Sequence, residues 1–279
     1  MSARFSFSTP STLRLGVLCV ALLALLAAAA GLLRPGDPMA MVGPRGLWPL
    51  TDGAFPLGTD QLGRDVAAQL LFGARVSLAV GVGAAAVATL IGVGLGAVAG
   101  YFGGVADHLL SRLCDYVQTL PSFLLSMVLV AVLAPSIGSV MVAIGLTSWP
   151  EIARLTRAEV LRIRNADWVL AARTMGLGHG HILLNHVLPN GIAPVVAMIA
   201  AVVAHAVLVE AALAFLGLGD PNLVSWGAMI GNARPLLRTL WYLMALPGLA
   251  IFATVMAFTL LGNGLSERLD PRGRRDDPW

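Results

Sequence analysis

The sequence predicts an all-α membrane protein with six transmembrane helices. Of its 279 residues, 57% are hydrophobic and only 12% are charged, and the mean hydropathy is +0.82. A soluble domain usually has about 25% charged residues. At about 20 residues per span, the chain has room for six or seven helices and their loops. A large water-soluble catalytic domain is therefore excluded, and we do not expect the chain to be an enzyme.

Six apolar stretches supply the expected spans. The first exceeds the apolar core of a secretory signal and is followed by more membrane, so we predict a retained anchor. The fourth is short for a span and is expected to continue as a helix beyond Pro150. The stretches cover residues 15–33, 76–102, 116–134, 136–150, 191–219 and 240–262.

The second stretch contains small residues at every fourth position: Ala84, Ala88, Gly92, Gly96 and Gly100. At this spacing they form one stripe along a helix. Small residues let helix backbones approach closely inside a membrane, where no hydrophobic force drives association. We therefore predict a helix-packing face.

The basic residues indicate orientation and exclude one chemistry. All 18 are Arg, so the chain has no lysine for a Walker A phosphate loop. Twelve Arg fall in segments that would be cytoplasmic if the N-terminus is inside, and six fall in the outer segments. The positive-inside rule then places both termini in the cytoplasm. Because the net charge of +3 comes from Arg mainly on one membrane face, nucleic acid is not an expected partner.

The long inner segment at residues 151–190, here called the coupling loop, is too polar to span. Its pattern predicts a helix over 159–175, stopped by Gly176 and Gly178, and a second short helix over 181–188, closed by Pro189. A structured cytoplasmic loop in a protein that is otherwise nearly all membrane predicts a partner that holds it.

The coupling loop resembles the "EAA…G…LP" loop of ABC importer permeases. The matching residues are Leu170, Ala171, Ala172, Gly176, Leu188 and Pro189, with Leu170 at the family's Glu. In that family the first short helix of the loop docks into a cleft on the ATPase subunit. The resemblance implies that the two Ala allow close approach, that Gly176 permits a sharp reversal and that Pro189 ends the loop. The change to Leu170 removes the carboxylate from any ion pair made there, and docking is still expected.

Four further segments resemble dipeptide, oligopeptide and nickel permeases. They are GTDQLGRD at 58–65, EAALAFLGLG at 210–219, SWG at 225–227 and LDPR at 269–272. The first is expected to form a turn and a short helix in which Asp60 and Arg64 pair at i, i+4. The implied organisation is a tail, anchor and outer loop over 1–56, a permease core over 57–272 and a tail over 273–279.

The resemblance implies a type I ABC importer-like permease in the bacterial inner membrane. It would form the solute pathway with a second homologous permease subunit. Two ABC ATPase subunits would bind ATP and Mg²⁺, so this chain would bind no cofactor itself, and an extracytoplasmic binding protein would deliver the solute. Peptides are the first expected substrate, with nickel or another small solute as the alternative.

Two ionisable residues, His205 and Glu210, fall within the fifth apolar stretch. Such groups are costly at membrane depth and mark candidate functional positions. They lie about 140° apart on a helix, so a His–Glu pair is not expected. Glu210 is expected to cap or pair within the bundle, with substrate contact as the alternative, and His205 to be packed and neutral, with a role in cargo choice as the alternative.

Other residues and patterns bear on a metal site and on two further classes of function. His179, His181 and His186 cluster in the coupling loop, but their spacing is not an established ligand pattern, so no metal site is predicted. A self-sufficient secondary transporter or channel remains an alternative class, although no inverted repeat is visible. A membrane enzyme is disfavoured because no set of convergent catalytic residues stands out.

Overall fold

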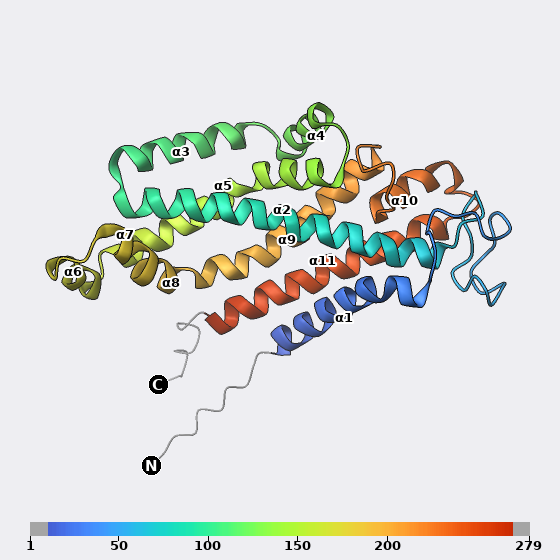
Figure 1. Ribbon diagram of the computed structural model, residues 1–279, viewed down its shortest axis with the longest axis horizontal. Coiled ribbons are helices and arrows are strands. Elements are labelled where there is room, and N and C mark those ends of the chain that lie inside the picture. The colour runs from blue at the N-terminus through green and yellow to red at the C-terminus, as the bar shows by residue number, and fades with distance from the viewer. Residues whose placement is uncertain (1–10, 270–279) are drawn as a thin grey trace, which may run out of the picture.

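The computed structural model describes residues 11–269, and these form an elongated bundle of helices (Figure 1). Five long helices lie side by side: α1 (Ser11–Leu33), α2 (Val66–Phe102), α5 (Ile137–Arg164), α9 (Ala193–Phe215) and α11 (Tyr242–Leu269). Helix α3 (Gly104–Thr119) runs alongside α2 and α5, and α4 (Ser122–Leu133) turns sharply away from the direction of α3 and packs against α5. The predicted all-α class is confirmed.

Short elements occupy the two ends of the bundle (Figure 1). The coupling loop forms one end, which we call the coupling end. It holds α6 (Asp167–Thr174), α7 (His179–Ile182), the π-helical turn η1 (Leu183–Val187) and α8 (Leu188–Gly191). The far end holds the loop over 34–65, α10 (Trp226–Ala233) and the 3₁₀ turn η2 (Arg234–Leu236).

Within residues 11–269, four helices are long and apolar enough to cross a membrane: α1, α2, α9 and α11. The pair α3 and α4 makes a fifth if it is taken as one broken span. Helix α5 does not meet the same criteria, because its second half contains charged residues such as Glu151, Arg154 and Arg157. It does continue through Pro150 to Arg164, as expected. The count of six spans stays a prediction.

The third apolar stretch is not the single span predicted over 116–134. It is divided between α3 and α4, whose axes differ by 84°. Pro121 lies at the break, where its missing N–H and fixed φ prevent a continuous helix. The hydroxyls of Ser126 and Thr147 lie 2.9 Å apart and connect α4 to α5.

Helix α2 begins at Val66, ten residues before the predicted span, because Asp65 caps it by accepting a hydrogen bond from the Ala67 N–H at 2.9 Å. The predicted short helix is absent from segment 58–65, and the predicted Asp60–Arg64 side-chain pair is wrong. Asp60 Oδ1 instead accepts the backbone N–H groups of Leu62 and Arg64, at 2.8 and 2.9 Å. These bonds close a turn that leads directly into α2.

The predicted stripe of small residues lies against α5. Helices α2 and α5 run parallel, with Gly92 opposite Ile152, Gly96 opposite Ala153, and Gly100 opposite Arg157 and Val160 further toward the coupling end. An added Cβ at any of the three glycines would come closer than 3.0 Å to α5 atoms, including backbone carbonyl oxygens. The two backbones are therefore in direct contact.

We predict that Gly96→Val destabilises the protein, because its side chain would have to displace the α5 backbone at Ala153. Overpacking of this kind costs about 1–3 kcal/mol or more. The measurement is the thermal unfolding midpoint of the detergent-purified chain, which should fall by several degrees. Gly94→Val is the matched control, since an added Cβ at Gly94 meets nothing within 4 Å. Equal midpoints for the two variants would contradict the packing argument.

Candidate functional site

The first part of the coupling loop is the second half of α5, and a break that the sequence pattern did not predict separates α5 from α6. The expected helix over 159–175 is wrong, because α5 ends at Arg164 and α6 begins at Asp167. The break lets α6 turn back, so that its buried Val169 and Ala172 join a cluster with residues of α2, α5, α7 and η1. Burying the apolar face of α6 is more favourable than extending α5 as one continuous helix.

Gly176 ends α6 in the manner that the resemblance implies. Its φ is +83°, a left-handed conformation that side chains other than glycine adopt at a cost. The Gly176 N–H donates to the Arg173 carbonyl at 3.0 Å and the Leu177 N–H to the Ala172 carbonyl at 3.2 Å. This pair of bonds is the Schellman motif. The chain therefore reverses directly after α6.

The second half of the coupling loop differs from the prediction. Instead of a helix over 181–188 closed by Pro189, the helical path starts at His179 and continues through Pro189 to Gly191. A proline in a helix removes one hydrogen bond and clashes with the carbonyl four residues earlier. Here the preceding turn is π-helical, with the Leu188 N–H donating to the Leu183 carbonyl five residues back. The wider turn accommodates Pro189 within the helix.

Tyr101, at the last turn of α2, connects the coupling loop to the bundle. Its hydroxyl lies 3.1 Å from Nδ1 of His179 on α7. The guanidinium of Arg173 on α6 lies over the Tyr101 ring, 5.3 Å from its centroid. One buried side chain of α2 thus contacts both α6 and α7. Sequence reasoning did not select Tyr101, although an amphipathic aromatic at a span boundary is a recognisable signal.

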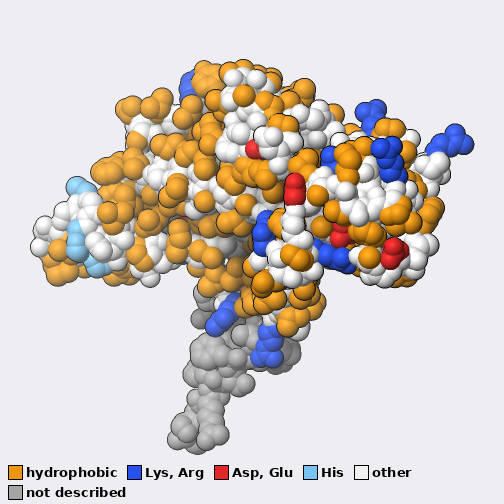
Figure 2. All heavy atoms as spheres, turned by 45° about the vertical axis from the view of Figure 1, so that its right-hand side comes forward, with side chains coloured by type: hydrophobic (Ala, Val, Ile, Leu, Met, Phe, Trp, Pro, Cys, Tyr) orange, Lys and Arg blue, Asp and Glu red, His pale blue; other side chains and the backbone are white. Residues whose placement is uncertain are grey.

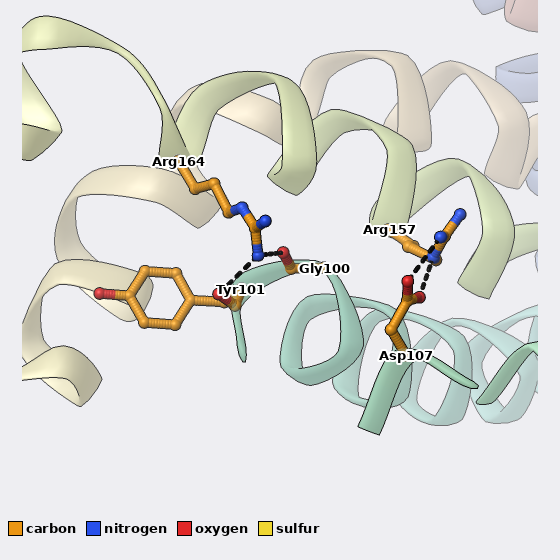
Figure 3. Close-up of polar contacts among 5 residues, drawn as sticks. All are labelled: Gly100, Tyr101, Asp107, Arg157 and Arg164. Atoms are coloured by element: carbon orange, nitrogen blue, oxygen red, sulfur yellow. Dashed lines mark hydrogen bonds and ion pairs between the residues drawn. The ribbon is translucent and has the colours of Figure 1, made fainter. Parts of the chain in front are cut away.

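The coupling end of α5 is joined to α2 and α3 by two arginines (Figure 3). Arg164 Nη1 donates to the carbonyls of Gly100 and Tyr101, at 3.1 and 3.2 Å, so it satisfies carbonyls that the end of α2 leaves free. Arg157 makes a two-pronged ion pair with Asp107 at the start of α3, and its Nη2 lies 2.7 Å from Oδ2. Helices α2, α3 and α5 are therefore fixed to one another beside the coupling loop.

The face of the coupling loop that points away from the helix bundle is apolar and uncovered. Trp168 and Ala171 are exposed, as are Leu170 at 44%, Met175 at 73% and Leu184 at 63%. Ala172, which follows Ala171 in the motif, is buried against the bundle. The two alanines therefore face opposite ways: Ala171 outward and Ala172 inward. An exposed apolar patch at the tip of a structured loop is typical of a docking surface.

The histidines of the coupling loop gather at this end of the molecule (Figure 2). His179 contacts Tyr101, and the rings of His181 and His186 lie 5.5 Å apart. Asn185 Nδ2 lies 3.2 Å from Nδ1 of His181. Among residues 11–269, no group of three or more His, Cys, Asp or Glu is arranged to hold a metal ion.

The two polar residues of α9 have different environments. Glu210 is 3% exposed, and its Oε2 accepts a hydrogen bond from Ser77 on α2 at 2.9 Å. His205 is exposed on the surface of the chain. Within the described chain His205 is thus not packed, because the helices around α9 leave this part of its surface uncovered.

Three of the four segments that resemble the permeases lie at the far end, opposite the coupling loop: 58–65, 210–219 and 225–227. Trp226 of the SWG segment is buried, and its indole N–H donates to the Leu70 carbonyl on α2 at 3.0 Å. Gly227 lies against the backbone of Ala211 in the EAALAFLGLG segment. In LDPR, positions 270–272 lie outside the described residues, as does the tail over 273–279.

Comparison with known proteins supports one family. The model of the family "Binding-protein-dependent transport system inner membrane component" matches residues 92–275. The di/tripeptide transport system permease protein DppC of Pseudomonas aeruginosa is 39% identical over 219 residues, covering 78% of this chain and 72% of the relative. The dipeptide transport system permease protein DppC of Haemophilus influenzae is 33% identical over 264 residues, covering 92% and 90%. The glutathione transport system permease protein GsiD of Pectobacterium atrosepticum is 37% identical over 217 residues, covering 77% and 72%.

The helical bundle with its coupling loop and these matches together define a multi-pass membrane component of a solute transport system. The chain belongs to the family of inner-membrane components of binding-protein-dependent transport systems. It is thus a permease subunit of an ABC importer rather than an enzyme or a self-sufficient secondary transporter.

We predict that Gly176→Val abolishes uptake while the protein still inserts into the membrane. The left-handed φ at this position costs a residue with a Cβ about 1–2 kcal/mol, and the cost is higher for a β-branched side chain. The reversal after α6 would shift and carry the docking face with it. The measurement is solute uptake by cells, with membrane insertion followed by immunoblotting of the membrane fraction.

Gly178→Val is the matched control for this change. Gly178 has φ −65° and ψ 146°, which any residue adopts, and an added Cβ there meets nothing within 4 Å. It should transport at close to the wild-type rate. Full transport by the Gly176 variant would argue against a fixed reversal as a requirement for coupling.

Proposed function

We propose that this chain is one of two permease subunits that form the pathway of an ATP-driven peptide importer. Its apolar face at the coupling end docks onto an ABC ATPase subunit, and an extracytoplasmic binding protein delivers the solute at the far end. The observation on which this proposal rests is the coupling loop: its outer face is uncovered while its inner face is fixed to α2 and α5.

The names of the relatives support peptides as the substrate. The three relatives described above are named for di- and tripeptides, dipeptides and glutathione, which is itself a peptide. None of these three names refers to nickel. Because the binding protein contributes much of the specificity in such systems, the identity of the peptides depends on a second protein.

The assembly we propose contains this chain, a second homologous permease, two ATPases that hold ATP and Mg²⁺, and the binding protein. The chain lies in the bacterial cytoplasmic membrane with both termini and the coupling loop in the cytoplasm. The excess of Arg at these segments supports this orientation.

ATP can drive such a system only if the ATPase dimer binds one conformational state of the permease more tightly than the other. A ligand that binds both states equally well does not shift the equilibrium between them. The attachments at the coupling end supply a path for that difference. Movement of α6 and α7 reaches α2 through Tyr101, and α2 moves with α5 because their backbones are in contact.

The substrate proposal predicts that deleting the chain abolishes uptake of radiolabelled dipeptide in its host, and that a plasmid copy restores it. An excess of unlabelled dipeptide should compete with this uptake, and an excess of Ni²⁺ should not. Dependence of ⁶³Ni²⁺ uptake on the chain, without dependence of dipeptide uptake, would contradict the proposal.

The orientation predicts a labelling pattern in intact cells. In a background with Cys19 and Cys114 replaced by Ser, Asp52→Cys in the far-end loop should react with a membrane-impermeant maleimide. Arg162→Cys, whose parent side chain is 58% exposed, should react only after permeabilisation. Ready labelling of Arg162→Cys in intact cells would reverse the proposed topology.

A further inference from the structure

One side of α9 remains uncovered between α5 and α11. Its other sides are packed: Val207 lies against Gly81 of α2, Leu213 joins a buried cluster with residues of α5, and Ala200 lies against Gly262 of α11. The residues left exposed repeat at helical spacing along the uncovered side. On this side they are Pro194, Ala201, His205 and Leu208, and Val196 is exposed on a different side of the helix.

This uncovered side is the floor of a groove with a volume of about 460 Å³. Leu155 of α5 forms one wall, and α11 forms the other with Phe258 and its neighbours. The floor includes Ala201, and His205 follows it by one helical turn on the same face. Three polar side chains of α11 line the groove and are exposed: Thr259, Asn263 and Ser266.

A lipid-facing surface does not suit these groups. His205 is the thirteenth of the 23 residues of α9, so it lies at mid-depth in an apolar helix. An imidazole exposed to hydrocarbon is costly, and such residues face a water-filled cavity or the bundle interior. Among the described residues no hydrogen bond to His205 is found, whereas Glu210 on the opposite side is bonded to Ser77. His205 is thus an exposed, unbonded polar group on the uncovered side of α9, one helical turn beyond the residues that line the groove.

We propose that the groove is this chain's wall of the solute pathway and that His205 is a residue that contacts the passing peptide. The imidazole donates one hydrogen bond and accepts another, as do the N–H and C=O groups of a peptide bond. The inference rests on the proposed function, because it names a peptide as the solute. It assigns the contact to His205 and not to Glu210, for which the sequence left substrate contact as the alternative to a role within the bundle.

The first test measures access of water to position 205. In the complete transporter, with native cysteines replaced by Ser, His205→Cys should react with a charged methanethiosulfonate reagent, and saturating dipeptide should slow the reaction several-fold. Leu22→Cys is the control at matched depth, because Leu22 is the twelfth of the 23 residues of α1 and is exposed on an apolar helix. It should not react. An unreactive His205→Cys would overturn the proposal.

The second test measures uptake of dipeptide by cells that carry the assembled transporter. His205→Leu should lower the uptake rate about tenfold, because the loss of a hydrogen bond to the passing solute costs on the order of 1 kcal/mol or more. His205→Gln, which still donates and accepts, should stay within about twofold of wild type. An unchanged rate for the Leu variant would overturn the proposal.

The two tests separate failure of this inference from failure of the proposed function. If wild-type cells take up no dipeptide, the peptide assignment fails, and the inference falls with it. If wild-type cells transport dipeptide and neither reactivity nor rate depends on position 205, only the inference fails.

Discussion

Direct backbone contact between α2 and α5 is the constraint on which the rest of the structure depends. Inside a membrane the apolar side chains gain little by leaving lipid, so helix association relies on close packing. Glycines at 92, 96 and 100 let α5 approach without an intervening side chain. Two parallel helices held in this way cannot rotate independently, and they form one unit from mid-bundle to the coupling end.

The coupling loop is built on this unit. Arg164 of α5 caps carbonyls at the end of α2, and Tyr101 of α2 contacts both α6 and α7. Val169 and Ala172 of α6 are buried in the same cluster as Val160 and Ile163 of α5. A partner that moves α6 therefore moves both long helices together, and the uncovered apolar face is the part of the loop left for that partner.

Local chemistry decided what could be predicted from the sequence. The stripe of small residues and the reversal at Gly176 depend on spacing and on one φ angle, and both are recognisable in the sequence. The break after Arg164, the 84° bend at Pro121 and the π-helical turn before Pro189 depend on which apolar faces meet in three dimensions. Short-range pattern contains no information on those contacts, so these features were missed or misplaced.

The same reasoning applies to the polar residues of α9. Helical period places His205 and Glu210 on different faces, but it does not say which face is covered. Coverage is decided by neighbours distant in sequence: Ser77 on α2 approaches Glu210, and no comparable group of the described chain reaches His205. Glu210 is therefore held within the bundle, whereas His205 is left uncovered by this chain. The different environments of the two residues thus follow from the arrangement of helices and not from either side chain alone.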